Sequence, residues 1–198
     1  ARPSAPTIQR AATGPPVLTE PTPILPIRQT VIFPGTIVPL SVGRPSSRQL
    51  LDEWLPHSKL IALFTQRNEE HEDPAIKDLY PMGTIGRVLR LIRQPDETVQ
   101  IIVHGLGRVK MKRAVQETPY LKAELTQPRE KPGKGKRFNA QVEQLREQAY
   151  QLIELLPNTP EQATTVLMNI DDPSNLADFL SANLELETEA KQALLEEL

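Results

Sequence analysis

The chain has 198 residues, 38% of them hydrophobic and 24% charged, with a formal net charge of −2. This length fits one domain or two small ones, and the composition is ordinary for a soluble globular fold with its own core. The absence of cysteine excludes disulfides, zinc sites with cysteine ligands and a thiol nucleophile, and it suits a reducing compartment. No apolar run approaches the roughly 20 residues that span a bilayer, and no signal peptide opens the chain. We therefore expect a cytoplasmic protein and, because residue 1 is not Met, a fragment of a longer chain.

The charges are distributed unevenly along the chain. Residues 138–198 hold two basic and twelve acidic side chains, a net of −10, so the remainder carries +8. Such a division is typical of two modules or of complementary surfaces. Ordinary solvated faces of either sign are the more common explanation.

The first segment differs in composition from the rest. Residues 1–23 hold six prolines, few large apolar side chains and no hydrophobic period. Such a segment cannot bury enough surface to offset the entropy lost on ordering. We expect residues 1–23 to be a flexible lead-in.

Residues 24–130 are expected to form a β-rich domain. Val99, Ile101 and Val103 alternate with polar residues, as half-buried antiparallel strands do. The sequence QPDE at 94–97 is a turn between two apolar runs, so residues 84–104 are predicted to form a hairpin. Further strands are expected near residues 60–64, 109–115 and 121–125, with basic outward faces.

One helix is predicted to interrupt these strands. Ser46 or Ser47 is suited to cap its first turn, and Pro56 ends it. Its buried stripe is predicted to contain Leu50, Leu51, Trp54 and Leu55.

A basic linker is expected at residues 131–137, within a stretch rich in proline and glycine. Residues 138–198 then predict a helical bundle. Apolar residues recur at helical spacing at Phe138, Val142, Leu145, Ala149, Leu152 and Leu156. Helix starts are predicted at residues 159–162 and 172–173, and a last helix near 188–198 places Ala190, Leu194, Leu195 and Leu198 on one face. The expected fold class is therefore α+β.

The sequence contains no recognisable catalytic motif. Residues 133–137 lack the spacing and the hydroxyl of a nucleotide-binding loop, and no G-x-S-x-G elbow occurs. The three histidines are isolated in sequence, so a metal site would need ligands brought together by the fold. We expect no catalytic residue, metal or cofactor in this chain.

Two other classes of partner are not favoured. Basic residues between 87 and 113 and at 129–137 could follow a phosphate backbone, but aromatic residues make up only 4% of the chain, few for a reader of single strands. The amphipathic helices of the last 60 residues have acidic polar faces, the wrong sign for anionic lipid. We expect neither nucleic acid nor membrane as the partner.

Several short motifs, taken in their order along the chain, resemble the N-terminal domain of the Lon protease family. The opening segment 24–48 supplies an LPIR entry, an FP corner, a P-L-x-V-G-R strand exit and a following helix start, and it departs at Gln29, where the family usually has Asp. The hairpin turn has Glu97 where the family usually has Gly. The further matches are EDP at 72–74, DLY at 78–80, GTIG at 83–86, HGLGR at 104–108, DPxxLADFL at 172–180 and AKQxLLE at 190–196.

The resemblance implies a PUA-like β-barrel or sheet domain of about six strands followed by a small helical bundle. It implies the part of an ATP-dependent serine protease that binds unfolded or damaged proteins, with no catalysis in this fragment. ATP and Mg are expected only for the missing ATPase domain, and a Ser-Lys proteolytic domain is expected beyond it. The parent is expected to be a hexamer, located in the mitochondrial matrix if it is organellar, whereas the fragment is expected to be a monomer or weak dimer.

Candidate substrate-binding residues lie in the strand exit, the following helix and the segment after the acidic loop. They are Val42, Arg44, Arg48, Leu51, Tyr80 and Met82. They border shallow apolar surface with charge, which suits recognition of many unfolded chains, as do the basic strand faces. The competing interpretation is core packing for the apolar residues and plain solvent exposure for the arginines. A further hypothesis is that the loop at 129–137 flexes and lets the helices swing against the β-domain.

Two alternative functions stay open at this point. A stand-alone domain of the same fold could bind a peptide or small ligand without a protease, as the cereblon-like branch does, although that branch carries a zinc-binding cysteine set that this chain lacks. A nucleic-acid-binding module is the third hypothesis.

Overall fold

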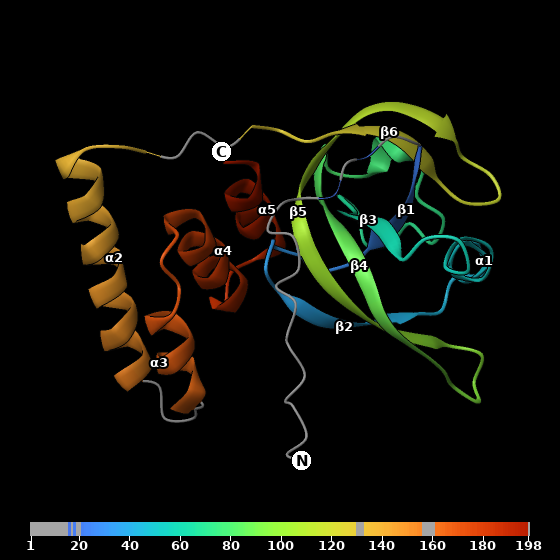
Figure 1. Cartoon of the computed structure of the whole chain (residues 1–198). Helices are drawn as coiled ribbons and strands as arrows, with labels where there is room; N and C mark the ends of the chain where they lie inside the picture. The colour runs from blue at the N-terminus through green and yellow to red at the C-terminus, as the bar shows by residue number, and fades with distance from the viewer. Residues whose placement is uncertain (1–15, 17, 19–20, 130–132, 156–160, 198) are drawn as a thin grey trace, which may run out of the picture.

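The computed structural model describes residues 16, 18, 21–129, 133–155 and 161–197. Within them, a six-stranded mixed sheet occupies one side of the molecule and four of the five α-helices the other (Figure 1). α4 and α5 lie next to the sheet, and α2 and α3 lie farther out. This arrangement confirms the predicted α+β class.

The sheet closes on itself. Its strands are β1 (Thr22–Ile27), β2 (Ile37–Val42), β3 (Leu60–Thr65), β4 (Met82–Arg93), β5 (Val99–Gln116) and β6 (Lys122–Thr126). Their order is β2-β5-β4-β3-β1-β6, and β6 pairs again with β5. Only β1 and β3 run parallel; the other pairs are antiparallel.

Closure depends on the length of β5. The predicted hairpin at 84–104 is confirmed, but the strand expected near 109–115 is part of the same 18-residue strand. Lys110 pairs with Met82 of β4 on one edge and with Thr126 of β6 on the other. The strands bend where the β4–β5 register shifts beside Gly86, at which a Cβ would lie 2.5 Å from Val103 Cγ1. A residue without a side chain is therefore required at this bend.

α1 (Pro45–Trp54) packs into one end of the closed sheet. Leu50, Leu51 and Leu55 are buried in the core, as predicted. The predicted serine cap is wrong: Arg44 is the N-cap residue, without a side-chain cap bond, Pro45 begins the helix, and Ser47 is buried. Proline suits this first position because it lacks the N–H that would be left unbonded there.

The remaining helices are α2 (Lys136–Leu155), α3 (Glu161–Met168), α4 (Pro173–Asn183) and α5 (Thr188–Glu196), with a short 3-10 turn, η1, at Ile76–Asp78. The predicted start at 172–173 is confirmed, because Asp172 Oδ1 accepts from the N–H of Ser174 at 2.9 Å and of Asn175 at 3.1 Å. Of the segment predicted to cap α3, residues 159 and 160 lie outside the described part. Leu18, from the segment expected to be a lead-in, packs against the sheet.

The buried faces of α2 and α5 differ from the predicted ones. On α2, Ala149 is buried where α3 and α4 pack against the helix, but Leu145 and Leu152 are exposed. On α5, Gln192 and Leu195 are buried, while Ala190 and Leu194 are exposed. Leu156 and Leu198 lie outside the described residues.

A buried ion pair joins the helices to the sheet. Arg108 of β5 donates to both carboxylate oxygens of Asp178 on α4, at 3.0 and 2.6 Å, and the two side chains are 8% and 4% exposed. Arg108 Nε also donates to the Leu195 carbonyl, and Gln192 donates to the Met82 carbonyl, both at 2.9 Å. Arg108 is one of the basic residues between 87 and 113 that could follow a phosphate backbone, but its burial removes it from the surface. Any swing of the helices that moved α4 or α5 would have to break these bonds.

The turn between β4 and β5 contains a strained residue. Glu97 has a φ of +64°, and its N–H donates to the Gln94 carbonyl at 3.2 Å. Glycine adopts this left-handed conformation without strain, whereas Glu does not. Arg48 of α1 holds the turn by donating to the Glu97 carbonyl at 3.0 Å and to its carboxylate at 2.9 Å.

Replacing Asp178 with Ala should lower the free energy of unfolding by about 3 kcal/mol, because the buried Arg108 charge would lose the carboxylate that binds it through two nitrogens. The control is Asp52→Ala, which breaks an exposed pair with Arg93 and should cost at most about 1 kcal/mol. Urea denaturation of both variants measures the difference. Equal losses would show that the Arg108–Asp178 pair contributes no more than a surface pair.

Replacing Glu97 with Gly should give a chain about 1 kcal/mol more stable than Glu97→Ala, because both lose the carboxylate contact to Arg48 but only Gly adopts the positive φ without strain. Thermal or urea unfolding of the two variants measures the gap. A Gly variant no more stable than the Ala variant would contradict strain at this turn.

Candidate functional site

Three of the predicted substrate-binding residues are part of the core. Val42 and Met82 are each 5% exposed and Leu51 is 1% exposed. Val42 and Leu51 belong to the cluster beneath α1, and Met82 packs with Val31, Phe33 and Leu195. Core packing, the competing interpretation for these apolar residues, is therefore their structural role.

The structure does not bring the other three together. Arg48 lies beside the β4–β5 turn, in a shallow pocket of about 480 Å³. Tyr80 is half-buried, and the Arg67 guanidinium lies 4.7 Å from the centre of its ring. Arg44 lies elsewhere, in a larger groove whose lining includes Val42.

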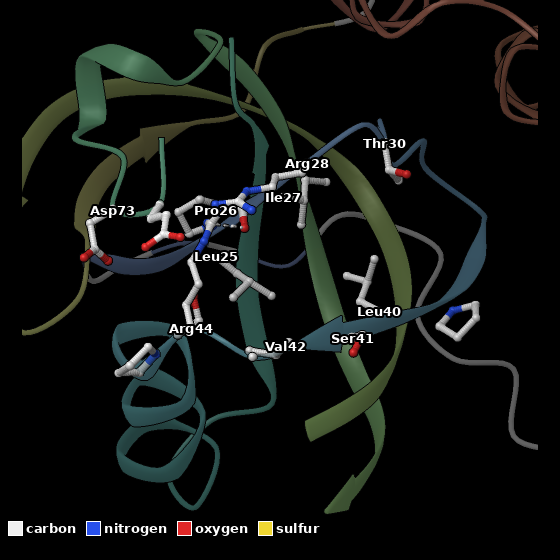
Figure 2. A pocket seen from close by; sticks show the side chains of 15 residues that line it. Leu25, Pro26, Ile27, Arg28, Thr30, Leu40, Ser41, Val42, Arg44 and Asp73 are labelled. Atoms are coloured by element: carbon white, nitrogen blue, oxygen red, sulfur yellow. Dashed lines mark hydrogen bonds between the residues drawn. The ribbon is translucent and has the colours of Figure 1, made fainter. Parts of the chain in front are cut away.

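This groove has a volume of about 570 Å³ and lies between β1 and β2 (Figure 2). Its apolar lining comes from Leu25 and Ile27 of β1 and from Leu40 and Val42 of β2. A second cavity, of about 360 Å³, shares Pro26, Arg44, Ser47 and Asp73 with it and extends toward Tyr120.

The groove exists because two strands have edges that do not pair with each other. β2 pairs only with β5, through residues 99–104. β1 pairs with β3 on one edge, but with β6 only at Thr22 and Pro23. The second edge of β1 beyond residue 24 therefore has no strand beside it among the described residues.

Two arginines converge at the groove in front of Pro26 (Figure 2). Arg44, held at the start of α1, donates to the Pro26 carbonyl at 3.3 Å and to Gln66 Oε1. Arg28 follows β1 and donates to the His71 carbonyl at 3.1 Å. The groove therefore carries two guanidinium groups that are directed at one place and bonded to uncharged oxygens.

Charges of both signs line this groove: Arg28 and Arg44 share it with Glu72 and Asp73. Burial lowers the pKa of Arg44 below its usual value, as does the nearby charge of Arg28, while Asp73 and Glu72 act in the opposite direction. Within the described residues, neither arginine has a carboxylate within ion-pair distance. Both guanidinium groups therefore lack a direct ion-pair partner among the described residues, and both could bond to an added carboxylate.

The described part of the chain shows neither a metal-binding cluster nor a membrane-spanning helix. No group of three or more His, Asp or Glu side chains there is arranged to hold a metal ion. No helix in that part is long and apolar enough to cross a membrane.

Arg28 and Gln66 are not among the site residues predicted from the sequence. Arg28 was visible only as part of the LPIR motif, and nothing in the local pattern indicates its approach to Arg44. Pro39 was a usable signal, because proline within a strand indicates an unpaired edge.

These features define a closed-sheet α+β domain with an open groove beside a strand edge. The family model for the ATP-dependent protease La (LON) substrate-binding domain matches residues 21–198. The chain is 38% identical over 175 residues to the Lon protease of Flavobacterium johnsoniae and 39% identical over 178 residues to Lon protease 2 of Myxococcus xanthus. These alignments cover 87% and 88% of this chain and 21% of each relative. The chain belongs to the Lon substrate-binding domain family.

Solved structures show the same fold. The N-terminal domain of the Mycobacterium avium complex Lon protease superimposes with a TM-score of 0.72 at 19% identity, covering 90% of this chain and 91% of that one. A Lon N-terminal domain protein from Xanthomonas campestris gives a TM-score of 0.51 at 17% identity, covering 83% and 99%. The chain therefore spans about a fifth of the length of the Lon proteases it matches and corresponds to an N-terminal domain.

Replacing Arg44 with Lys should lower the free energy of unfolding by about 1 kcal/mol, because an ammonium group cannot reproduce the planar contacts to Pro26 and Gln66. Arg28→Gln, at an exposed position, should leave stability nearly unchanged. Urea denaturation of both variants tests this, and an equally stable Arg44→Lys chain would contradict the anchoring role of Arg44.

Proposed function

We propose that this chain is the substrate-receiving domain of an ATP-dependent serine protease of the Lon type, and that it binds unfolded or damaged proteins for delivery to the ATPase and protease domains of its parent. The observation that carries the proposal is the match of residues 21–198 to the substrate-binding domain family. The short coverage of the relatives supports it, because most of each Lon protease lies outside the matched region.

The groove supports the same proposal. It is open, it is lined by apolar residues and by charged ones of both signs, and it runs between two extended strands. Such a site suits a flexible chain with varied side chains better than one compact ligand. ATP and Mg belong, in this proposal, to the ATPase domain of the parent.

The predicted residues take different parts in this function. Arg44 contacts substrate at the groove, with Val42 in the groove lining. Arg48 and Tyr80 offer further contacts beyond the groove. Leu51 and Met82 support these surfaces from the core.

The proposed assembly and location follow from the parent. The parent is a hexamer formed through its ATPase ring, in the cytoplasm or the mitochondrial matrix. The separate 198-residue chain is a monomer or weak dimer.

Binding of the chain to a fluorescently labelled, permanently unfolded protein should be stronger than binding to the same protein in its folded form. The preference should survive a rise in salt, because burial of apolar surface is not screened as charge attraction is. Fluorescence anisotropy at two salt concentrations measures it. A short RNA is the control ligand, and equal affinity for folded and unfolded protein, or binding to RNA alone at low salt, would overturn the proposal.

A further inference from the structure

The outer edge of β2 is free among the described residues. The Gly105 N–H donates to the Thr36 carbonyl at 2.9 Å, in the same register that pairs β2 with β5. Because bonded pairs alternate along antiparallel strands, residues 38, 40 and 42 bond to β5 and residues 37, 39 and 41 face outward. Pro39 fits this assignment, since its missing N–H falls on the outer edge.

This free edge borders the groove. The groove is lined by two runs of consecutive residues, 39–43 and 25–28. A strand that turned one face to a cavity would line it with every second residue, so consecutive residues indicate that the strand edges border the groove. Ile37 and Ser41 therefore offer an N–H and a carbonyl each, and Pro39 a carbonyl, to an incoming strand. An extended segment would lie about 4.8 Å from β2 and place alternate side chains against the apolar lining.

The arginines select the charge of that segment. Arg28 and Arg44 converge at the groove, which Glu72 and Asp73 also line. Among the described residues neither arginine has a carboxylate within ion-pair distance, so each guanidinium can still pair with an acidic side chain of the segment. One acidic side chain between them would form hydrogen bonds assisted by charge.

We propose that the groove binds an extended polypeptide segment by strand addition to the free edge of β2, with an Asp or Glu side chain of that segment between Arg28 and Arg44. The inference rests on the proposed function and adds to it the conformation and the charge of the bound segment.

The first test uses a ten-residue peptide of alternating Val and Thr with one central Asp, acetylated and amidated so that no terminal carboxylate competes. Its affinity should exceed that of the Asn version about tenfold, the value of one charged hydrogen bond. Arg28→Gln should weaken binding of the Asp peptide and leave that of the Asn peptide unchanged. Arg137→Gln on α2, an equal change of charge far from the groove, should weaken neither. Equal affinity for the two peptides would overturn the acidic contact.

The second test addresses the backbone. Ser41→Pro removes an outward N–H that Ser41→Ala keeps, so the Pro variant should bind the peptide about tenfold more weakly than the Ala variant. Exchange of the Ile37 and Ser41 amides should slow when peptide is added to the native chain. A further test changes the peptide and leaves the protein unaltered: its backbone nitrogens are methylated either at odd or at even positions. Only one of the two sets faces β2, so methylation of that set alone should prevent pairing with β2. Equal binding by both methylated sets, or protection confined to other strands, would overturn strand addition.

The two proposals fail in different ways. If the native chain and Ser41→Pro bind unfolded protein equally well, strand addition to β2 is wrong and the proposed function stands. If the native chain does not distinguish unfolded from folded protein, the proposed function itself is wrong.

Discussion

The structure depends on the continuous extension of β5 over 18 residues. One edge of this strand pairs with β4, and the other pairs first with β2 and then with β6. A shorter strand could form the hairpin but could not close the sheet. β5 also carries Arg108, the residue that binds α4, so one strand fixes both the closure of the sheet and the position of the nearest helices.

The same constraint produces the groove. β2 and β6 take successive stretches of one β5 edge, so they lie end to end along it and do not pair with each other. β1 pairs with β6 at Thr22 and Pro23 and then separates from it. The later residues of β1 therefore lie opposite β2. Arg44 partly fills the gap by bonding to the free Pro26 carbonyl. The groove is thus a consequence of sheet topology, with Glu72 and Asp73 added to its lining by the segment after β3.

Features that depend on residues close in sequence could be predicted from the sequence. The turn before Thr98, the Asp172 cap and the buried stripe of Leu50 and Leu51 all follow from residues close in sequence. The burial of Arg108 could not be predicted, because its partner lies 70 residues away. The groove depends equally on distant contacts, since the edges of β1 and β2 become neighbours only when β5 and β6 pair. The faces of α2 and α5 depend on which neighbours pack there, which spacing alone does not define.

The pairing of β1 with β6 has a consequence for synthesis of the chain. Thr22 of the first strand pairs with Ala123 of the last, and Ile24 donates to the Leu121 carbonyl at 2.8 Å. The closed sheet therefore cannot form on the ribosome until about a hundred further residues have followed β1 out of the tunnel. Contacts so distant in sequence slow folding and leave apolar strand edges open in the meantime. A domain that is proposed to bind unfolded proteins thus passes, during its own synthesis, through a state that such a domain would recognise.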